Sequence, residues 1–193
     1  MGFFAKIMAF IAAAIVQGTP LLFGATGEII TEKSGNLNLG IPGIMYIGGI
    51  SGIIGGYLYE HFCAEPVPIL CVLISLLASV IGSTFIAFIY SFLTITLRAN
   101  QNVTGLALTT LGIGLGNFLG ASLINITKSE LPSIALTKTS SFFSAKLPFA
   151  EKLGWFGELF LSHDFLTYLA IVIAVVATIV LKRTRVGLNL RAV

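Results

Sequence analysis

The chain has 193 residues, of which 56% are hydrophobic and only 10% are charged, and its mean hydropathy is +0.98. This composition excludes an ordinary water-soluble domain and predicts an integral membrane protein. The net charge of +3 is small, and the basic residues are not interleaved with aromatic ones, so no nucleic-acid partner is indicated. Two cysteines, Cys63 and Cys71, are too few for a disulfide framework and are interpreted as small apolar side chains.

The first apolar segment, from about Phe4 to Ala25, is long enough to cross a bilayer as a helix. Lys6 precedes the apolar run from Ile7 to Val16 as in a signal peptide, but no clean cleavage site follows and the apolar character resumes at Pro20, so we expect a retained transmembrane helix. Glu28 and Glu32 follow on one helical face. We interpret them as a solvated helix end, because nothing nearby buries them or supplies a nucleophile.

Four further segments predict membrane spans, at about 42–59, 68–93, 103–124 and 165–181. The polar stretch at 125–164 predicts an extracytoplasmic loop with an interfacial helix near Trp155. The predicted fold is therefore an all-α, polytopic membrane helix bundle of about five transmembrane helices, forming one domain over 1–193. The dense basic cluster at 182–193 favours a cytoplasmic C-terminus.

Small residues recur at every fourth position in three of the predicted spans. Small side chains let helix backbones approach closely in a membrane, so these rows predict tight helix packing. The rows are Gly48, Gly52 and Gly56 in the second span, Ser75, Ser79 and Ser83 in the third, and Gly112, Gly116 and Gly120 in the fourth.

The stretch GNLNLGIPG, at 35–43, separates the first two spans. A continuous helix from Ser34 to Tyr59 would be about 39 Å long, more than a membrane requires, whereas Pro42 suits a first helical turn. We expect a broken or re-entrant segment before the second span, with Asn36 and Asn38 satisfying backbone beside a polar path. The alternative is an ordinary interfacial turn.

Polar residues of the fourth span also have two interpretations each. Asn117 either lines a substrate path or forms an interhelical hydrogen bond. Thr104 and Gly105 are expected to open the span, where Thr104 either caps the helix or contacts substrate. Near the end of the second span, His61 and Cys63 lie between Glu60 and Glu65, but a short polar loop is favoured over a metal site.

Three blocks of the chain resemble permease subunits of bacterial nucleoside and simple-sugar ATP-binding-cassette importers, which share their architecture with branched-chain amino acid permeases. They occur in the family's order and span nearly the whole chain. The blocks are TPLLFGATGEIITEKSGNLNLGIPGIMYIGG at 19–49, LRANQNVTGLALTTLGIGLGNFLG at 97–120, and RTRVGLNLRAV at 183–193.

The resemblance implies a multi-pass subunit of the bacterial cytoplasmic membrane that pairs with a second permease subunit, docks on cytoplasmic ATPase subunits and receives substrate from a binding lipoprotein. It also implies that the subunit is not an enzyme and needs no cofactor, with ATP bound by the partner; the chain indeed lacks a Walker-type phosphate loop. Contact with the ATPase is expected at 182–193, through Thr184, Gly187, Leu188 and Arg191. From the residues alone, Arg191 serves either coupling or positive-inside anchoring.

Two departures from the family pattern are visible. Pro42 stands where the family usually has an acidic residue, and the chain stops where similar permeases enter their coupling helix, so we expect a truncated permease. The alternatives to a nucleoside or sugar permease are a branched-chain amino acid permease and a non-transporting scaffold or channel. An intramembrane enzyme is disfavoured, because no His, Ser and carboxylate constellation lies within a span.

Overall fold

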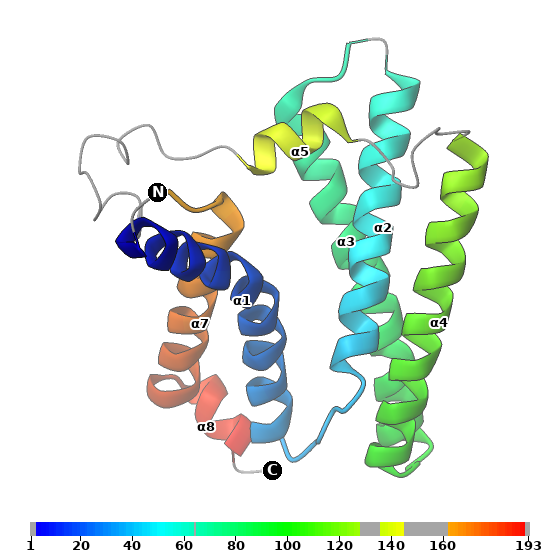
Figure 1. Ribbon diagram of the computed structural model, residues 1–193. Coiled ribbons are helices and arrows are strands. Elements are labelled where there is room, and N and C mark those ends of the chain that lie inside the picture. Colours follow the sequence, from blue (N-terminus) through cyan, green and yellow to red (C-terminus); the bar gives the residue numbers. More distant parts are fainter. Residues whose placement is uncertain (1–2, 64, 128–135, 145–161, 192–193) are drawn as a thin grey trace. The chain divides into compact units, whose positions relative to one another are not determined.

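The computed structural model describes residues 3–63, 65–127, 136–144 and 162–191 (Figure 1). The regular structure of these residues is helical throughout, as predicted for an all-α bundle. The elements are α1 (Phe3–Lys33), α2 (Ile41–Phe62), α3 (Pro68–Ser91), the π-helix η1 (Phe92–Thr96), α4 (Gln101–Thr127), α5 (Thr137–Phe143), α7 (Phe165–Arg183) and α8 (Arg185–Arg191).

Five helices within the described residues are long and apolar enough to cross a membrane, which confirms the predicted number of spans. The crossing segments are Lys6–Lys33, Ile41–Phe62, Pro68–Thr96, Gln101–Ser122 and Phe165–Arg183. Most of the large hydrophobic side chains on these helices are exposed, as expected of surfaces that face lipid. The interfacial helix predicted near Trp155 lies outside the described residues.

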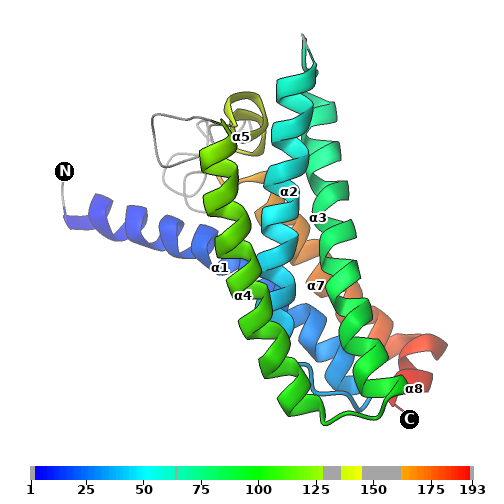
Figure 2. The same cartoon turned by 90° about the vertical axis from the view of Figure 1, so that its right-hand side faces the viewer.

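The helices form two compact units, Asn36–Phe142 and a unit made of Met1–Gly35 with Phe143–Val193. In the first unit, α2 packs between α3 and α4 (Figure 2). Its core is built from Ile44 and Ile47 of α2, Ile86 and Tyr90 of α3, and Leu108 of α4. Since α2 contributes to both interfaces, it is the central helix of this unit.

In the other unit, α1 packs along α7, and α8 returns against α7. A hydrogen bond of 3.0 Å joins the hydroxyls of Thr19 and Thr167. Figure 2 shows α1 bent, and Pro20 inside this helix explains the bend because it cannot donate a hydrogen bond to the preceding turn.

Helix α1 continues past the predicted end of the first span, Ala25, as far as Lys33. The hydropathy pattern marks only the apolar part, whereas Glu and Lys are good helix formers that extend the helix into polar surroundings. Two residues after the end of the helix, Gly35 has a φ of +81°, in the left-handed region that glycine favours at helix ends. The prediction that Glu28 and Glu32 sit at a helix end is consistent with these bounds.

Candidate functional site

The backbone at 36–40, which we call the unwound segment, is not helical, as predicted. Helix α2 begins at Ile41 with a proline in its first turn. Such a segment leaves its N–H and C=O groups without helical partners, and each needs another partner if it is buried in a membrane. This segment can therefore lie between helices only if side chains of those helices form hydrogen bonds with its backbone groups.

On one side, helix α3 supplies a partner through Tyr90. The Tyr90 hydroxyl donates a hydrogen bond of 2.6 Å to the backbone carbonyl of Leu37. Tyr90 is itself only 4% exposed, so its ring belongs to the core while its hydroxyl reaches the unwound segment.

On the other side, helix α4 supplies partners through Gln101 and Thr109. The Gln101 amide accepts the N–H of Leu37 at 2.9 Å and donates to Oδ1 of Asn36, also at 2.9 Å. The Thr109 hydroxyl donates to the carbonyl of Leu39 at 2.7 Å. Two helices distant in sequence thus replace the hydrogen bonds that a helical backbone would make internally.

Asn38 is the buried polar residue of the segment, with 5% of its surface exposed. Its Oδ1 accepts the N–H of Gly40 at 2.9 Å, which forms a local turn. The two interpretations of GNLNLGIPG therefore both hold in part, since the asparagine makes a turn and neighbouring helices shelter that turn. A role of Asn36 and Asn38 beside a substrate path stays a prediction.

Glycines allow α4 to approach this segment closely. A Cβ added to Gly105 would lie 2.9 Å from the backbone N of Leu39, and one added to Gly112 would lie 2.6 Å from Cα of Gly43. Real Cβ atoms do not come this close to backbone, so both positions require glycine. Gly105 lies seven residues before Gly112, on the same face of α4, which extends the predicted glycine row by two turns.

The predicted start of the fourth span at Thr104 and Gly105 is wrong, because α4 begins at Gln101. The cap is Asn100, whose Oδ1 accepts the N–H groups of Asn102 and Val103 at 3.0 and 3.2 Å. Thr104 instead lies within the first turns and is buried, so it does not cap the helix. Its alternative role in contacting substrate stays a prediction.

Asn117 accepts a hydrogen bond of 2.8 Å from the hydroxyl of Tyr46, and this bond joins α4 to α2. The interhelical bond considered for Asn117 is thus confirmed. Tyr46 is 41% exposed and Asn117 is also exposed in this chain, so the pair forms a polar spot on an otherwise apolar surface. Nothing in the sequence of α2 alone marks Tyr46 as this partner.

The predicted small-residue rows of α2 and α3 pack against each other. Cβ atoms added to Gly48 and Gly52 would each lie 3.3 Å from a serine Cβ, those of Ser83 and Ser79 respectively. A Cβ added to Gly56 would likewise meet the hydroxyl oxygen of Ser75. The paired numbers run in opposite directions, so α2 and α3 are antiparallel, and the rows predicted separately form one interface.

In the fourth-span row, Gly116 faces the ring of Tyr46, and a Cβ on Gly120 would lie 3.7 Å from Cδ1 of Ile50. Together with Gly112 against Gly43, these contacts place α4 along α2 in the parallel direction. All three glycines of this row therefore face α2, as the packing prediction requires.

Helix α3 ends in an irregular turn. The π-helix η1 is followed by Arg98, which has a φ of +54°, and the N–H of Ala99 donates to the carbonyl of Leu93 at 3.0 Å. Glycine is the usual residue in this left-handed conformation. The turn leads directly into the Asn100 cap and so positions Gln101 beside the unwound segment.

At the C-terminal end, Thr184 connects α7 to α8. Its hydroxyl donates to the carbonyl of Val180 at 2.7 Å and accepts the N–H of Gly187 at 3.2 Å. A Cβ on Gly187 would lie 2.5 Å from Cα of Leu181, so glycine is needed for α8 to fold back on α7.

Leu188 is 61% exposed, and α8 ends at Arg191. The predicted segment at 182–193 therefore contains a short helix with an apolar side chain available for contact.

Near the end of α2, the described residues contain no group of three or more His, Cys, Asp or Glu side chains that could hold a metal ion. Glu60 instead accepts the backbone N–H of Thr139 at 2.7 Å and so ties α2 to α5. His61 stacks on Tyr57 with ring centroids 5.5 Å apart. Glu60 and His61 therefore lie on an extended α2, where each has a structural partner, and not in the loop that we expected.

Comparison with known proteins gives a family match over residues 10–193, to the permease component of branched-chain amino acid transport systems. The chain is 28% identical to the guanosine ABC transporter permease protein of Bacillus subtilis over 95% of its length and 54% of the relative's. It is 29% identical to the putative glucose ABC transporter permease protein of Haloferax volcanii over 94% of its length and 50% of the relative's.

A nucleoside ABC transporter permease protein of Lactococcus lactis is 29% identical, over 95% of this chain and 55% of the relative. The chain thus spans about half the length of the curated relatives that it matches. No solved structure matches it significantly.

Proposed function

The chain belongs to the permease-component family of branched-chain amino acid transport systems, and from this premise we propose that it forms part of the translocation path of an ATP-binding-cassette importer for nucleosides or related sugars. The family match over residues 10–193 carries this proposal. The five apolar helices support a multi-pass protein, whose membrane we propose is the bacterial cytoplasmic membrane.

The substrate class rests on the relatives, which are named for guanosine, nucleoside and glucose transport. A branched-chain amino acid is the second candidate, because the family description names that substrate. Both classes are polar solutes, and both need polar groups along a path through lipid.

The polar residues proposed for the path are Asn36, Asn38, Thr104 and Asn117. The Tyr46–Asn117 pair supports this placement, because it leaves an amide N–H₂ group and an aromatic ring exposed on the membrane-spanning part of α2 and α4. An amide beside an aromatic ring suits a nucleobase or a sugar, which offers hydrogen-bonding edges together with an apolar face.

Energy for transport would come through contact with ATPase subunits rather than from chemistry in this chain. We place the contact at α8, with Thr184 and Gly187 setting its angle and the exposed Leu188 available to the partner. Arg191, the last residue of α8, is proposed as the basic residue of the contact. A second permease subunit and a substrate-binding lipoprotein complete the proposed assembly.

The test is uptake of labelled guanosine, glucose and leucine by cells that express the chain with its transport system. Asn117→Leu is expected to lower nucleoside or sugar uptake at least tenfold while membrane insertion is unchanged. Asn102→Leu, an exposed asparagine in the first turn of the same helix, is the matched control. If the cells take up leucine but neither guanosine nor glucose, the substrate is a branched-chain amino acid and the proposed substrate class is wrong. Uptake that persists without ATP hydrolysis would favour a channel.

A further inference from the structure

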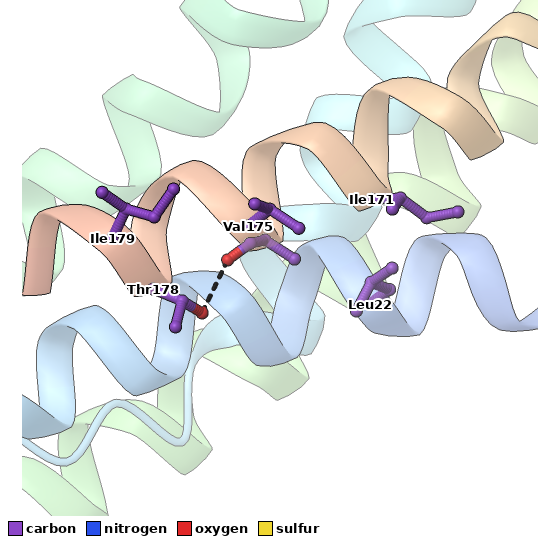
Figure 3. Close-up of a pocket in the computed structure, with 6 residues that line it drawn as sticks. Leu22, Ile171, Val175, Thr178 and Ile179 are labelled. Carbon is purple, nitrogen blue, oxygen red and sulfur yellow. Dashed lines mark hydrogen bonds between the residues drawn. The ribbon is translucent and has the colours of Figure 1, made fainter. Parts of the chain in front are cut away.

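An apolar groove runs between α1 and α7 in the unit that these helices form. It holds a cavity of about 390 Å³ lined by Leu22, Ile171, Ala174, Val175, Thr178 and Ile179. Figure 3 shows Leu22 on α1 lying across from the α7 side chains, with the Thr178 hydroxyl bonded back to its own helix. Because that hydroxyl is already bonded, the lining is apolar in effect.

A second cavity, of about 370 Å³, is lined by Ile29, Lys33, Thr178, Leu181 and Lys182. Thr178 lines both cavities, so they are adjacent along α7, and together we call them the α1–α7 groove. One part of this groove is lined by apolar side chains, and two lysines from two different helices, Lys33 and Lys182, line the other part.

Lys33 and Lys182 have no hydrogen-bond or ion-pair partner among the residues that the structure describes. Glu32, the neighbour of Lys33 in sequence, does not line the cavity, and Arg183 and Arg185 add positive charge nearby. Two unpaired cations at the end of an apolar groove complement a ligand that has an anionic head and an apolar tail.

The length of the groove also fits such a ligand. From Ile171 to Lys182, helix α7 rises about 16 Å, which is roughly half of the 30 Å thickness of a bilayer's hydrocarbon core. Both lysines lie in the last turn of their helices, where a membrane-spanning helix reaches the headgroup region. The groove therefore extends over one leaflet, from the headgroups toward the bilayer centre.

We propose that the α1–α7 groove is a binding site for an anionic phospholipid, with the phosphate between Lys33 and Lys182 and an acyl chain along Leu22, Val175 and Ile179. A free phosphate ion would use the lysines but not the apolar part of the groove. The proposal concerns the α1 and α7 unit alone, and it does not depend on which solute the permease carries.

The experiment is native mass spectrometry of the purified chain after addition of phosphatidylglycerol or phosphatidylcholine with the same acyl chains. Phosphatidylglycerol is expected to remain bound about tenfold more often, because two basic residues act on its charge. The double variant Lys33→Gln with Lys182→Gln should remove this preference, while Lys6→Gln, a lysine near the opposite end of α1, should keep it.

A second variant tests the apolar part of the site. Val175→Trp places a large ring in the groove at a position that is 53% exposed, so folding is retained and lipid retention should fall several-fold. Equal retention of the two lipids, or an unchanged preference in the double lysine variant, would overturn the proposal. Complete displacement of the lipid by millimolar inorganic phosphate would overturn it as well. The proposal would also be overturned if the purified chain formed a dimer without bound lipid and Val175→Trp dissociated that dimer.

Discussion

The hydroxyl of Tyr90 in α3 donates a hydrogen bond of 2.6 Å to the carbonyl of Leu37 in the unwound segment before α2. This bond joins a core side chain to backbone that has no helical partner. It gives the first prediction, that Tyr90→Phe lowers the free energy of unfolding in mixed micelles by about 0.6–2 kcal/mol. Tyr59→Phe is the control, because the hydroxyl of Tyr59 has no partner among the described residues. An equal effect of both variants would show that the bond contributes nothing.

Gln101 supports the same segment with two hydrogen bonds, one accepted and one donated. Gln101→Glu keeps the acceptor for Leu37 but loses the donor to Asn36, whereas Gln101→Leu loses both. We therefore expect stability in the order wild type, Gln101→Glu, Gln101→Leu, with steps of about 1 kcal/mol each. Unfolding by denaturing detergent, followed by circular dichroism, measures the order. A variant Gln101→Leu as stable as wild type would contradict the proposed support.

The packing of α2 on α3 makes Gly52 sensitive to enlargement. Gly52→Val places atoms within 3.3 Å of Ser79, so we expect a loss of about 1–3 kcal/mol from overpacking. Gly49→Val is the matched control on the same helix, since a Cβ there meets nothing within 4 Å. Thermal unfolding of the two variants in one detergent makes the comparison. A lower melting temperature for Gly49→Val than for Gly52→Val would mean that the glycine row is not the interface.

Gly187→Ala is expected to detach α8 from the end of α7, because its methyl group would overlap the backbone of Leu181. The expected result is trypsin cleavage after Arg183 or Arg185 that is several-fold faster than in wild type, measured by mass spectrometry of the released peptide. Leu188→Ala, at an exposed position of the same helix, should leave the rate unchanged. Equal rates in all three proteins would show that α8 does not need this close approach.

The membrane class, the number of spans and the small-residue rows follow from the sequence itself, because hydropathy and helical periodicity are local properties of the chain. The break before α2 was also predictable, since Pro42 fixes its own φ and suits a first helical turn wherever it occurs. The predicted helix ends were less accurate than the predicted spans, as at the start of α4. Asparagine caps such as Asn100, and polar residues that extend a helix, carry no hydropathy signal.

Only the tertiary structure decided which groups meet. The bond of Tyr90 to Leu37, the double contact of Gln101 and the pairing of Tyr46 with Asn117 each join residues more than fifty positions apart. A hydrogen bond depends on the positions of both partners, and those positions are set by helix packing. The sequence thus determined that unwound backbone needs partners, and the packing of α3 and α4 against α2 determined which residues provide them.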